Sequence, residues 1–185
     1  MIDIHAHLAP GLDDGAGNEG EALELARLAW ADGITTVIAT PHIREGIFGN
    51  DAQSISGAVG RLRKLVEAAG LGGQRGPGLQ VVEGAEVLLS PGLVEKFQQG
   101  VYPTLGRSNY ALVELPFQEA PLYTREVLFR LQMGGFTPIL AHPERNLTVA
   151  QEPSLIYELV GKGVLIQVNA GSLTGHFGPR VRALV

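Results

Sequence analysis

Short apolar runs alternate along this chain with segments of helical periodicity, and this alternation constrains the fold more than any other feature. Most of the apolar runs are continuous rather than alternating, which is typical of parallel strands covered on both faces. Strands are expected at 2–5, 34–40, 79–84, 110–115, 138–142 and 164–169. Helices are expected between them, at 19–32, 51–69, 93–99, 124–133 and 154–160. The pattern predicts an α/β fold with parallel strands.

The first expected helix has recognisable signals at both ends. Asn18 can cap it, Glu21 can complete a capping box, and Gly33 is well placed to stop it. The glycine-rich stretch 70–78 is expected to be a loop. It superficially suggests a phosphate-binding loop, but it precedes a strand instead of a helix, so that interpretation is discounted.

Composition excludes several classes of function. The 185 residues suffice for one domain with a core, and the formal net charge of −5 argues against a general nucleic-acid binder. The chain has no cysteine, so neither disulfides nor a cysteinyl-phosphate intermediate are possible. No secretory signal and no apolar run of membrane-spanning length is visible, so a cytoplasmic protein without direct membrane insertion is expected.

Residues with metal-binding chemistry fall where the expected strands end. The first strand ends His5-Ala6-His7, and residues two apart on a strand point to the same side, so both imidazoles can face one ion. The carboxyl ends of parallel strands are where α/β folds place their active sites. The later strand ends carry His42, Glu86, Glu114 and His142.

Each of these residues also has an ordinary interpretation. A lone His or Glu at a strand end is usually a surface residue or a hydrogen-bonded cap, but five strand ends with imidazole or carboxylate form a much stronger signal. Glu114 lies in an apolar stretch, and burying a carboxylate is costly unless it is paired or metal-bound. Asp13 and Asp14 precede Gly15, which is typical of a turn; Asp14 is preferred as a ligand and Asp13 as support.

The candidate ligands combine imidazole nitrogen with carboxylate oxygen and contain no sulfur, which suits Mn²⁺, Fe²⁺ or Zn²⁺. Seven ligands are too many for one catalytic ion that keeps an open position. Two or three ions are expected, with a carboxylate such as Glu86 bridging a pair.

Six stretches of the sequence match a known family: MIDIHAHLAPGLDDGA, ATPHIREGIF, VVEGAEV, ALVEL, LAHPERN and IQVNAGSLTG. They resemble the bacterial tyrosine-protein phosphatases of the polymerase-and-histidinol-phosphatase (PHP) superfamily, which accompany capsular and exopolysaccharide synthesis. The match is collinear and covers essentially the whole chain. PGLDDGA, HPER and QVNAGSLTG are more specific than the scattered ligands that the whole superfamily shares.

The resemblance implies a distorted (β/α)7 barrel of the TIM-like kind and a single PHP-type domain over residues 1–185 with a three-metal site. It implies that Arg145 contacts the phosphate. Arg44 could reach a phosphate or the tyrosine-bearing peptide, and a solvated surface arginine is an equal alternative. Asn169 either shapes the metal cleft or caps a helix. The metal ligands that the resemblance implies are His5, His7, Asp14, His42, Glu86, Glu114 and His142.

The resemblance also implies an activity, which is hydrolysis of phosphotyrosine on the tail of a cognate tyrosine autokinase. The expected mechanism is attack by a metal-activated water, with no protein nucleophile. Two alternatives stay open at this point. One is another PHP-type phosphoesterase that acts on histidinol phosphate or a nucleotide, and the other is an inactive fragment that binds a partner.

The family pattern continues to a last strand that ends in an Asp-x-His pair, which supplies two more ligands. No such pair follows Asn169, and no aspartate occurs after Asp51. The expectation is therefore a barrel without its last strand, in which at least one ion binds weakly and the edge of the first strand is exposed.

Overall fold

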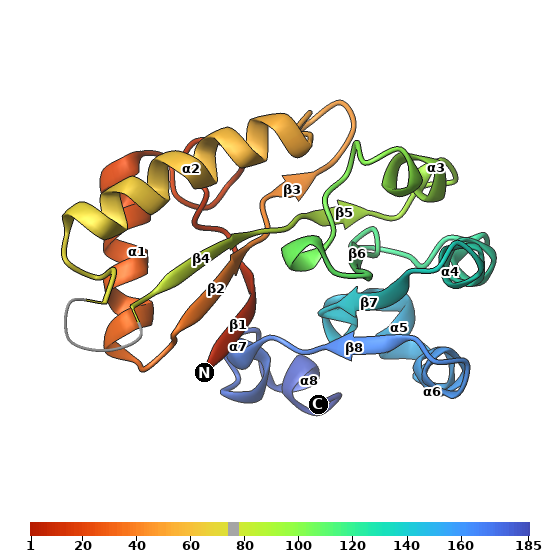
Figure 1. Ribbon diagram of the computed structural model, residues 1–185. Helices are drawn as coiled ribbons and strands as arrows, with labels where there is room; N and C mark the ends of the chain where they lie inside the picture. The colour runs from red at the N-terminus through yellow and green to blue at the C-terminus, as the bar shows by residue number, and fades with distance from the viewer. Residues whose placement is uncertain (74–77) are drawn as a thin grey trace. The chain divides into compact units, whose positions relative to one another are not determined.

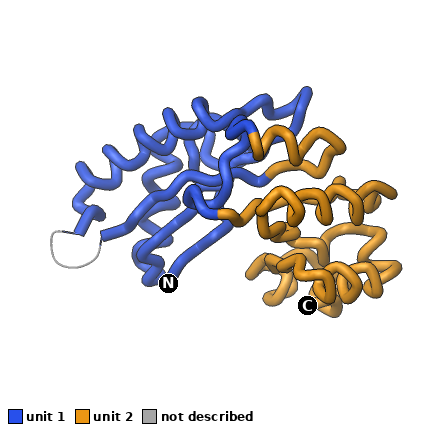
Figure 2. The backbone as a smooth tube through the Cα atoms, turned by 45° about the vertical axis from the view of Figure 1, so that its right-hand side comes forward, with its two compact units in different colours: residues 1–86, 99–108 blue, residues 87–98, 109–185 orange. Residues whose placement is uncertain are grey.

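The computed structural model describes residues 1–73 and 78–185, which form two compact units (Figure 2). Unit 1 comprises Met1–Glu86 and Gln99–Ser108, and unit 2 comprises Val87–Gln98 and Asn109–Val185. Part of the expected loop at 70–78 lies outside the described residues.

Unit 1 is built on a parallel sheet with the strand order β1-β2-β4 (Figure 1). These strands are β1 (Ile2–Ala6), β2 (Thr36–Ala39) and β4 (Gln80–Glu83). Unit 1 also contains two α-helices, α1 (Glu19–Ala31) and α2 (Ala52–Ala68), and the 3₁₀ helix η1 (Leu105–Arg107). Helix α2 packs on β4 and on α1. The expected α/β class with parallel strands is confirmed.

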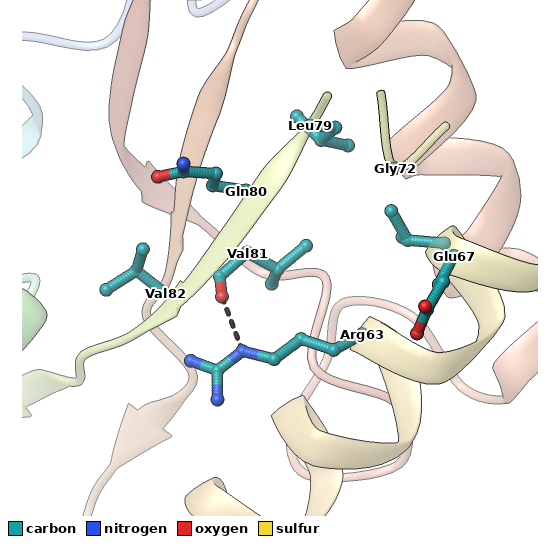
Figure 3. Close-up of a pocket in the computed structure, with 8 residues that line it drawn as sticks. Arg63, Glu67, Gly72, Leu79, Gln80, Val81 and Val82 are labelled. Atoms are coloured by element: carbon teal, nitrogen blue, oxygen red, sulfur yellow. Dashed lines mark hydrogen bonds between the residues drawn. The ribbon is translucent and has the colours of Figure 1, made fainter. Parts of the chain in front are cut away.

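Helix α2 presents a wholly apolar face to the core. Ile55, Val59 and Leu62 recur at helical spacing and are fully buried. A hydrogen bond also joins the helix to the sheet: Arg63 Nε donates to the carbonyl oxygen of Val81 at 2.7 Å (Figure 3). Both residues line a pocket between α2 and β4. This bond places β4, and with it the chain that leads to Glu86, against the helix.

The caps of α1 follow the sequence signals with one correction. Asn18 accepts a hydrogen bond from the Glu21 N–H at 3.0 Å, and Gly33 follows the helix with a φ of 82°. The Glu21 carboxylate accepts from the N–H of Gly17 at 2.8 Å, one residue before the cap. The second half of the expected capping box is therefore wrong, because the long Glu side chain reaches past the cap residue.

Strands β2 and β4 each stop and are followed by a further short strand, a feature that the apolar pattern did not predict. After β2, Thr40 and Pro41 intervene before β3 (His42–Ile43), and after β4, Gly84 and Ala85 intervene before β5 (Glu86–Leu88). Proline has no N–H for a ladder bond. A Cβ on Gly84 would lie 2.7 Å from Ile38 Cγ2, so the chain approaches β2 too closely for a side chain. His42 and Glu86 thus begin new strands instead of ending the long ones.

Unit 2 contains the parallel strands β6 (Tyr110–Glu114), β7 (Thr137–Ala141) and β8 (Leu165–Gln167), in that order. Their register aligns Glu114 with Ala141, and Ala141 with Gln167, so their carboxyl ends lie at one edge of the sheet. Helix α4 (Thr124–Met133) packs on β7. The other helices of the unit are α3 (Leu93–Gln98), the 3₁₀ helix η2 (Pro143–Arg145), α5 (Leu147–Gln151), α6 (Ser154–Gly161), α7 (Ala170–Leu173) and α8 (Pro179–Arg182).

All six expected strands and all five expected helices are present, with ends that differ by one or two residues at most positions. The described strands belong to two sheets and not to one closed ring. Within the described residues, no helix has the length and apolar character that crossing a membrane requires.

Candidate metal and phosphate site

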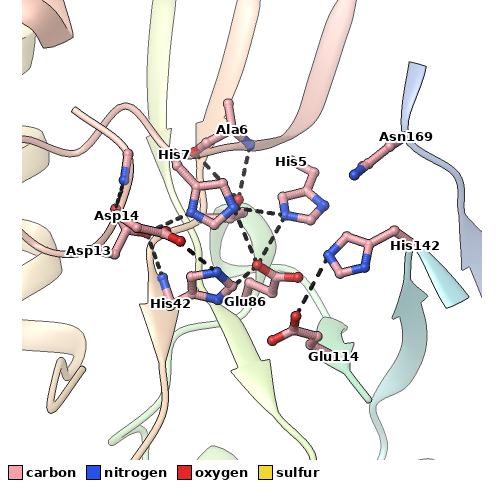
Figure 4. Close-up of polar contacts among 12 residues, drawn as sticks. His5, Ala6, His7, Asp13, Asp14, His42, Glu86, Glu114, His142 and Asn169 are labelled. Atoms are coloured by element: carbon pink, nitrogen blue, oxygen red, sulfur yellow. Dashed lines mark hydrogen bonds and ion pairs between the residues drawn. The ribbon is translucent and has the colours of Figure 1, made fainter. Parts of the chain in front are cut away.

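Three side chains of unit 1 place their donor atoms around one point. His5 Nε2 lies 3.2 Å from His7 Nε2 and 3.2 Å from Glu86 Oε2, and His7 Nε2 lies 3.3 Å from Glu86 Oε2 (Figure 4). Two ligands bonded at about 2.1 Å to one ion, at an angle near 100°, are themselves about 3.2 Å apart. The triangle of donor atoms therefore has the dimensions of a metal coordination shell.

A bulge in β1 aims the two histidines. The pairing with β2 shifts register between Asp3 and Ala6, so β1 contains one residue more than its partner. The His5 N–H donates to Asp3 Oδ1 at 3.0 Å, and the Ala6 N–H donates to Thr40 Oγ1 at 3.0 Å. Side-chain oxygens thus satisfy the backbone donors that the irregular pairing leaves, and His5 stays largely buried.

Asp13 lies behind His7 and not in the triangle. Its Oδ2 is 2.6 Å from His7 Nδ1 and accepts from the His42 N–H at 2.9 Å, while Oδ1 accepts from the Gly15 N–H at 3.0 Å. The Asp13 side chain is fully buried. A Cβ on Gly15 would lie 2.1 Å from the His7 carbonyl oxygen, so only glycine lets the turn fold back this closely.

His7 and Asp13 each stabilise the charged form of the other. Burial lowers the pKa of His7, but hydrogen bonds and attraction from Asp13 and Glu86 outweigh it and raise that pKa from 6.5 to about 10. Burial raises the pKa of Asp13, yet the hydrogen bonds from His7, from the His42 N–H and from the Gly15 N–H bring that pKa below its ordinary value. Without a metal ion, His7 and Asp13 therefore form an ion pair at neutral pH.

His42 extends the cluster on its other side. Its Nδ1 lies 3.0 Å from Glu86 Oε2, and its Nε2 lies 3.7 Å from Asp14 Oδ1. Asp14 is mostly exposed, whereas the Glu86 side chain is fully buried. One oxygen of Glu86 is thus within 3.3 Å of a nitrogen of each of three histidines, which is the position that a bridging carboxylate requires.

Arg44 and Phe48 flank His42. Arg44 Nη2 lies 3.4 Å from His42 Nε2, and the Phe48 ring stacks on the imidazole with centroids 5.8 Å apart and planes 9° apart. Arg44 and Phe48 also form a small antiparallel bridge. The structure therefore brings the half-buried Arg44 beside a candidate ligand.

In unit 2, Glu114 and His142 form a second group. Both are buried, and Glu114 Oε1 lies 4.0 Å from His142 Nε2 (Figure 4). They line a small pocket together with Arg145 and Phe117. His142 has a φ of 29°, a left-handed conformation that is rare for a residue with a Cβ and that clusters at functional sites.

The comparisons with known proteins place the chain. Its whole length, residues 1–185, matches the family model described as capsular polysaccharide synthesis, CpsB/CapC.

This chain belongs to the CpsB/CapC family.

Proteins with related sequences carry consistent names. The chain is 37% identical to tyrosine-protein phosphatase YwqE of Bacillus subtilis, over 99% of this chain and 70% of that protein. It is 34% identical to the putative tyrosine-protein phosphatase CapC of Staphylococcus aureus, over 100% of this chain and 70% of that protein. It is 28% identical to tyrosine-protein phosphatase CpsB of Streptococcus pneumoniae, over 92% of this chain and 68% of that protein.

A solved structure agrees with these relatives. The crystal structures of YwqE from Bacillus subtilis and CpsB from Streptococcus pneumoniae are described as those of metal-dependent tyrosine phosphatases. One of these chains superposes with a TM-score of 0.92 at 37% identity, and the match covers 99% of this chain and 72% of that chain.

The residues of this CpsB/CapC chain fit metal ions. Imidazole nitrogen and carboxylate oxygen surround one point, no thiolate is available, and a buried carboxylate lies between three imidazoles. His5, His7 and Glu86 form one group with metal-binding spacing, and His7, Asp14 and His42 form another. A metal-dependent chemistry therefore agrees with both the donor set and the relatives.

Sequence reasoning gave no role to Glu144, which is 4% exposed. Its Oε1 accepts hydrogen bonds from Ser172 Oγ at 2.6 Å and from the Asn169 N–H at 3.2 Å. Its position between His142 and Arg145 was the available signal.

Asn169 precedes α7, but its side chain forms no cap hydrogen bond. Its side-chain oxygen instead accepts a hydrogen bond from Gln167 Nε2 at 2.9 Å. The expected capping role of the Asn169 side chain is therefore wrong: its oxygen faces Gln167 and accepts no hydrogen bond from a backbone N–H of α7.

Proposed function

We propose that this chain is a metal-dependent protein-tyrosine phosphatase. The observation that carries the proposal is the triangle of His5 Nε2, His7 Nε2 and Glu86 Oε2, with sides of 3.2, 3.2 and 3.3 Å. Membership of the CpsB/CapC family and relatives named tyrosine-protein phosphatases give the reaction class.

The proposed ligand set has seven members and holds two or three ions of Mn²⁺, Fe²⁺ or Zn²⁺. Glu86 would be shared between two of these ions, since its Oε2 lies near three imidazole nitrogens. The full set is His5, His7, Asp14, His42, Glu86, Glu114 and His142. When bound, such ions lower the pKa of a coordinated water and neutralise phosphoryl charge.

The chain's own residues prepare the site for this chemistry. Asp13 accepts the His7 Nδ1–H and so turns the lone pair of Nε2 toward Glu86 and His5. Arg145 and Arg44 are proposed to bind oxygens of the phosphoryl group, whose charge shifts during the reaction. The phenolate of tyrosine has a pKa near 10, so it departs without the help that an alkoxide needs.

The proposed substrate is the phosphotyrosine-bearing tail of a tyrosine kinase that controls capsule or exopolysaccharide synthesis, inside the cytoplasm. The proposed architecture is a single PHP-type domain over residues 1–185 in the form of a distorted (β/α)7 barrel. The parallel strands and the superposition with one chain from the YwqE and CpsB crystal structures support this architecture.

The test measures metal content and hydrolysis of a phosphotyrosine peptide by the same preparation. We expect hydrolysis with Mn²⁺, its loss in excess chelator and its recovery when Mn²⁺ returns. His42→Ala should lower the rate by orders of magnitude, whereas the matched control His176→Ala changes an exposed histidine and should keep the metal content. Activity that persists in excess chelator would contradict the metal mechanism. Faster turnover of histidinol phosphate than of the peptide would favour the other phosphoesterase.

A further inference from the structure

Arg145 is the basic residue of the pocket that contains Glu114 and His142. Among the side chains that line this pocket, it is the one that carries a permanent positive charge. An anionic group that enters the pocket therefore meets this guanidinium. The precision with which the guanidinium is held then determines how well it binds a phosphoryl group.

The backbone of Arg145 is fixed by its neighbours. The His142 carbonyl oxygen accepts from the Arg145 N–H at 3.1 Å, within the turn that the positive φ of His142 begins. Asn146 Nδ2 donates to the Pro116 carbonyl oxygen at 2.7 Å. The long side chain of Arg145 still has several rotatable bonds, so a fixed backbone alone does not place the guanidinium.

An aromatic ring restricts that side chain. Arg145 Cζ lies 4.4 Å from the centroid of the Phe177 ring, over its face. This is the geometry of a cation–π interaction, and it limits the rotamers that the arginine can adopt. Phe177 is partly exposed, with 38% of its surface accessible, so burial in a core does not explain its placement.

Phe177 is itself held by helix α7. A Cβ on Gly171 would lie 3.0 Å from Phe177 Cε2, so the ring packs directly on the backbone of the helix. The buried carboxylate of Glu144 anchors α7 through Ser172 Oγ and the Asn169 N–H. Glu144 and Arg145 are adjacent residues of η2. The same short helix therefore anchors α7 through Glu144 and places Arg145 against the Phe177 ring that α7 supports.

We propose that Phe177 and Glu144 are positioning residues for Arg145: Glu144 anchors α7, α7 supports the Phe177 ring, and the ring holds the guanidinium ready for a phosphoryl group. The proposal rests on the phosphatase function proposed above. It adds two residues that neither ligate a metal nor touch the reacting atoms.

The first experiment observes the arginine directly and does not depend on activity. The Nε–H signal of Arg145 in a ¹H–¹⁵N spectrum should be shifted upfield by the ring, with assignment from Arg145→Lys. Phe177→Leu should remove this shift, while the matched control Phe129→Leu, which changes another exposed phenylalanine of unit 2, should keep it. A signal that Phe177→Leu leaves unchanged would overturn the stacking.

The second experiment measures inhibition of phosphotyrosine-peptide hydrolysis by inorganic phosphate. Phe177→Leu should weaken phosphate binding and raise KM by roughly three- to tenfold at unchanged metal content. In an Arg145→Ala background the same substitution should have no further effect. An equal loss in both backgrounds would show a merely structural role and overturn the proposal.

Glu144 is tested by a pair of substitutions. Glu144→Ala should weaken phosphate binding as Phe177→Leu does, and Glu144→Gln should restore most of it, because the amide oxygen can still accept from Ser172 Oγ. If Glu144→Ala leaves phosphate binding and the Arg145 signal unchanged, its positioning role is wrong. A wild-type chain with neither metal-dependent hydrolysis nor phosphate binding would overturn the proposed function itself, and the spectrum would then still decide whether Phe177 holds Arg145.

Discussion

Glu86 is the residue on which the candidate site most depends. Its side chain is fully buried, and one of its oxygens lies within 3.3 Å of His5, His7 and His42. A carboxylate in this environment is costly unless cations or hydrogen-bond donors surround it. Three imidazoles and the metal ions that they bind would compensate that cost.

Asp13 allows a prediction about support for the ligands. Asp13→Asn should weaken metal binding about 10- to 100-fold, because the amide can no longer hold His7 Nδ1–H as strongly or add its charge to the cluster. Metal titration by calorimetry measures the change. Asp32→Asn, a substitution of the same type at an exposed position, is the control; equal affinity for wild type and Asp13→Asn would contradict the assigned role.

The raised pKa of His7 predicts how metal-free protein responds to pH. Its ion pair with Asp13 contributes stability that is complete below the unfolded pKa of 6.5 and is lost as pH rises through about 10. The thermal midpoint of chelator-treated protein should therefore fall between pH 6.5 and pH 10. Asp13→Asn should flatten this fall; a midpoint that rises over the same range would contradict the prediction.

The same proton competes with the metal. Binding an ion at His7 requires the neutral imidazole, so metal affinity should increase as pH rises from 6 to 9 and binding should release protons. Titrations in two buffers with different ionisation enthalpies count the released protons. A pH-independent affinity would show that His7 is not a ligand.

Among the secondary-structure elements, the short strands β3 and β5 matter more for the positions of the candidate ligands than the longer strands do. The interruptions at Thr40–Pro41 and Gly84–Ala85 turn the chain so that His42 and Glu86 begin β3 and β5. Helix α2 supports this arrangement through its buried face and through the bond from Arg63 to the Val81 carbonyl oxygen. The two interruptions therefore set the positions of these candidate ligands, and helix α2 and the strands of the sheet hold the interruptions in place.

The cap of α2 gives a prediction about stability alone. Asp51 accepts from the Ser54 N–H at 2.8 Å, and Ser54 Oγ accepts from the Asp51 N–H at 2.9 Å, which is a complete capping box. Asp51→Ala should reduce the free energy of unfolding by about 1 kcal/mol. Urea denaturation measures this, and metal content should stay unchanged. A loss of metal in the folded variant would show that α2 and the site are more tightly coupled than proposed.

At the scale of the whole molecule, metal binding should stabilise the fold. The ligands of unit 1 come from β1 and the residue that follows it, from the turn at Asp14, from β3 and from β5, and an unfolded chain does not hold them together. At an ion concentration 100 times the Kd, a single site adds about 2.7 kcal/mol to the free energy of unfolding. Mn²⁺ should therefore raise the thermal midpoints of wild type and of His176→Ala. It should raise the thermal midpoint of Glu86→Ala much less. Equal shifts in all three would contradict the assigned site.

Patterns among neighbouring residues are enough to predict the class of fold and the metal-binding chemistry of the candidate ligands. Continuous apolar runs indicate buried parallel strands, and the helices between them follow from local periodicity and capping, which are properties of neighbouring residues. The candidate ligands were recognisable because imidazole and carboxylate groups at strand ends are unusual beside apolar runs. These signals are local, so they could be predicted.

Which of these groups lie close together, and which residues hold them there, follows from long-range packing that the sequence patterns do not show. The bulge in β1, the breaks before His42 and Glu86, and the hydrogen bond from the His42 N–H to Asp13 depend on backbone that approaches from distant parts of the chain. The same holds for Glu144, which accepts from Ser172, and for Arg145, which lies on the Phe177 ring. Such contacts join residues about 30 positions apart and leave no periodic pattern in sequence, because they arise from packing and not from local backbone preference.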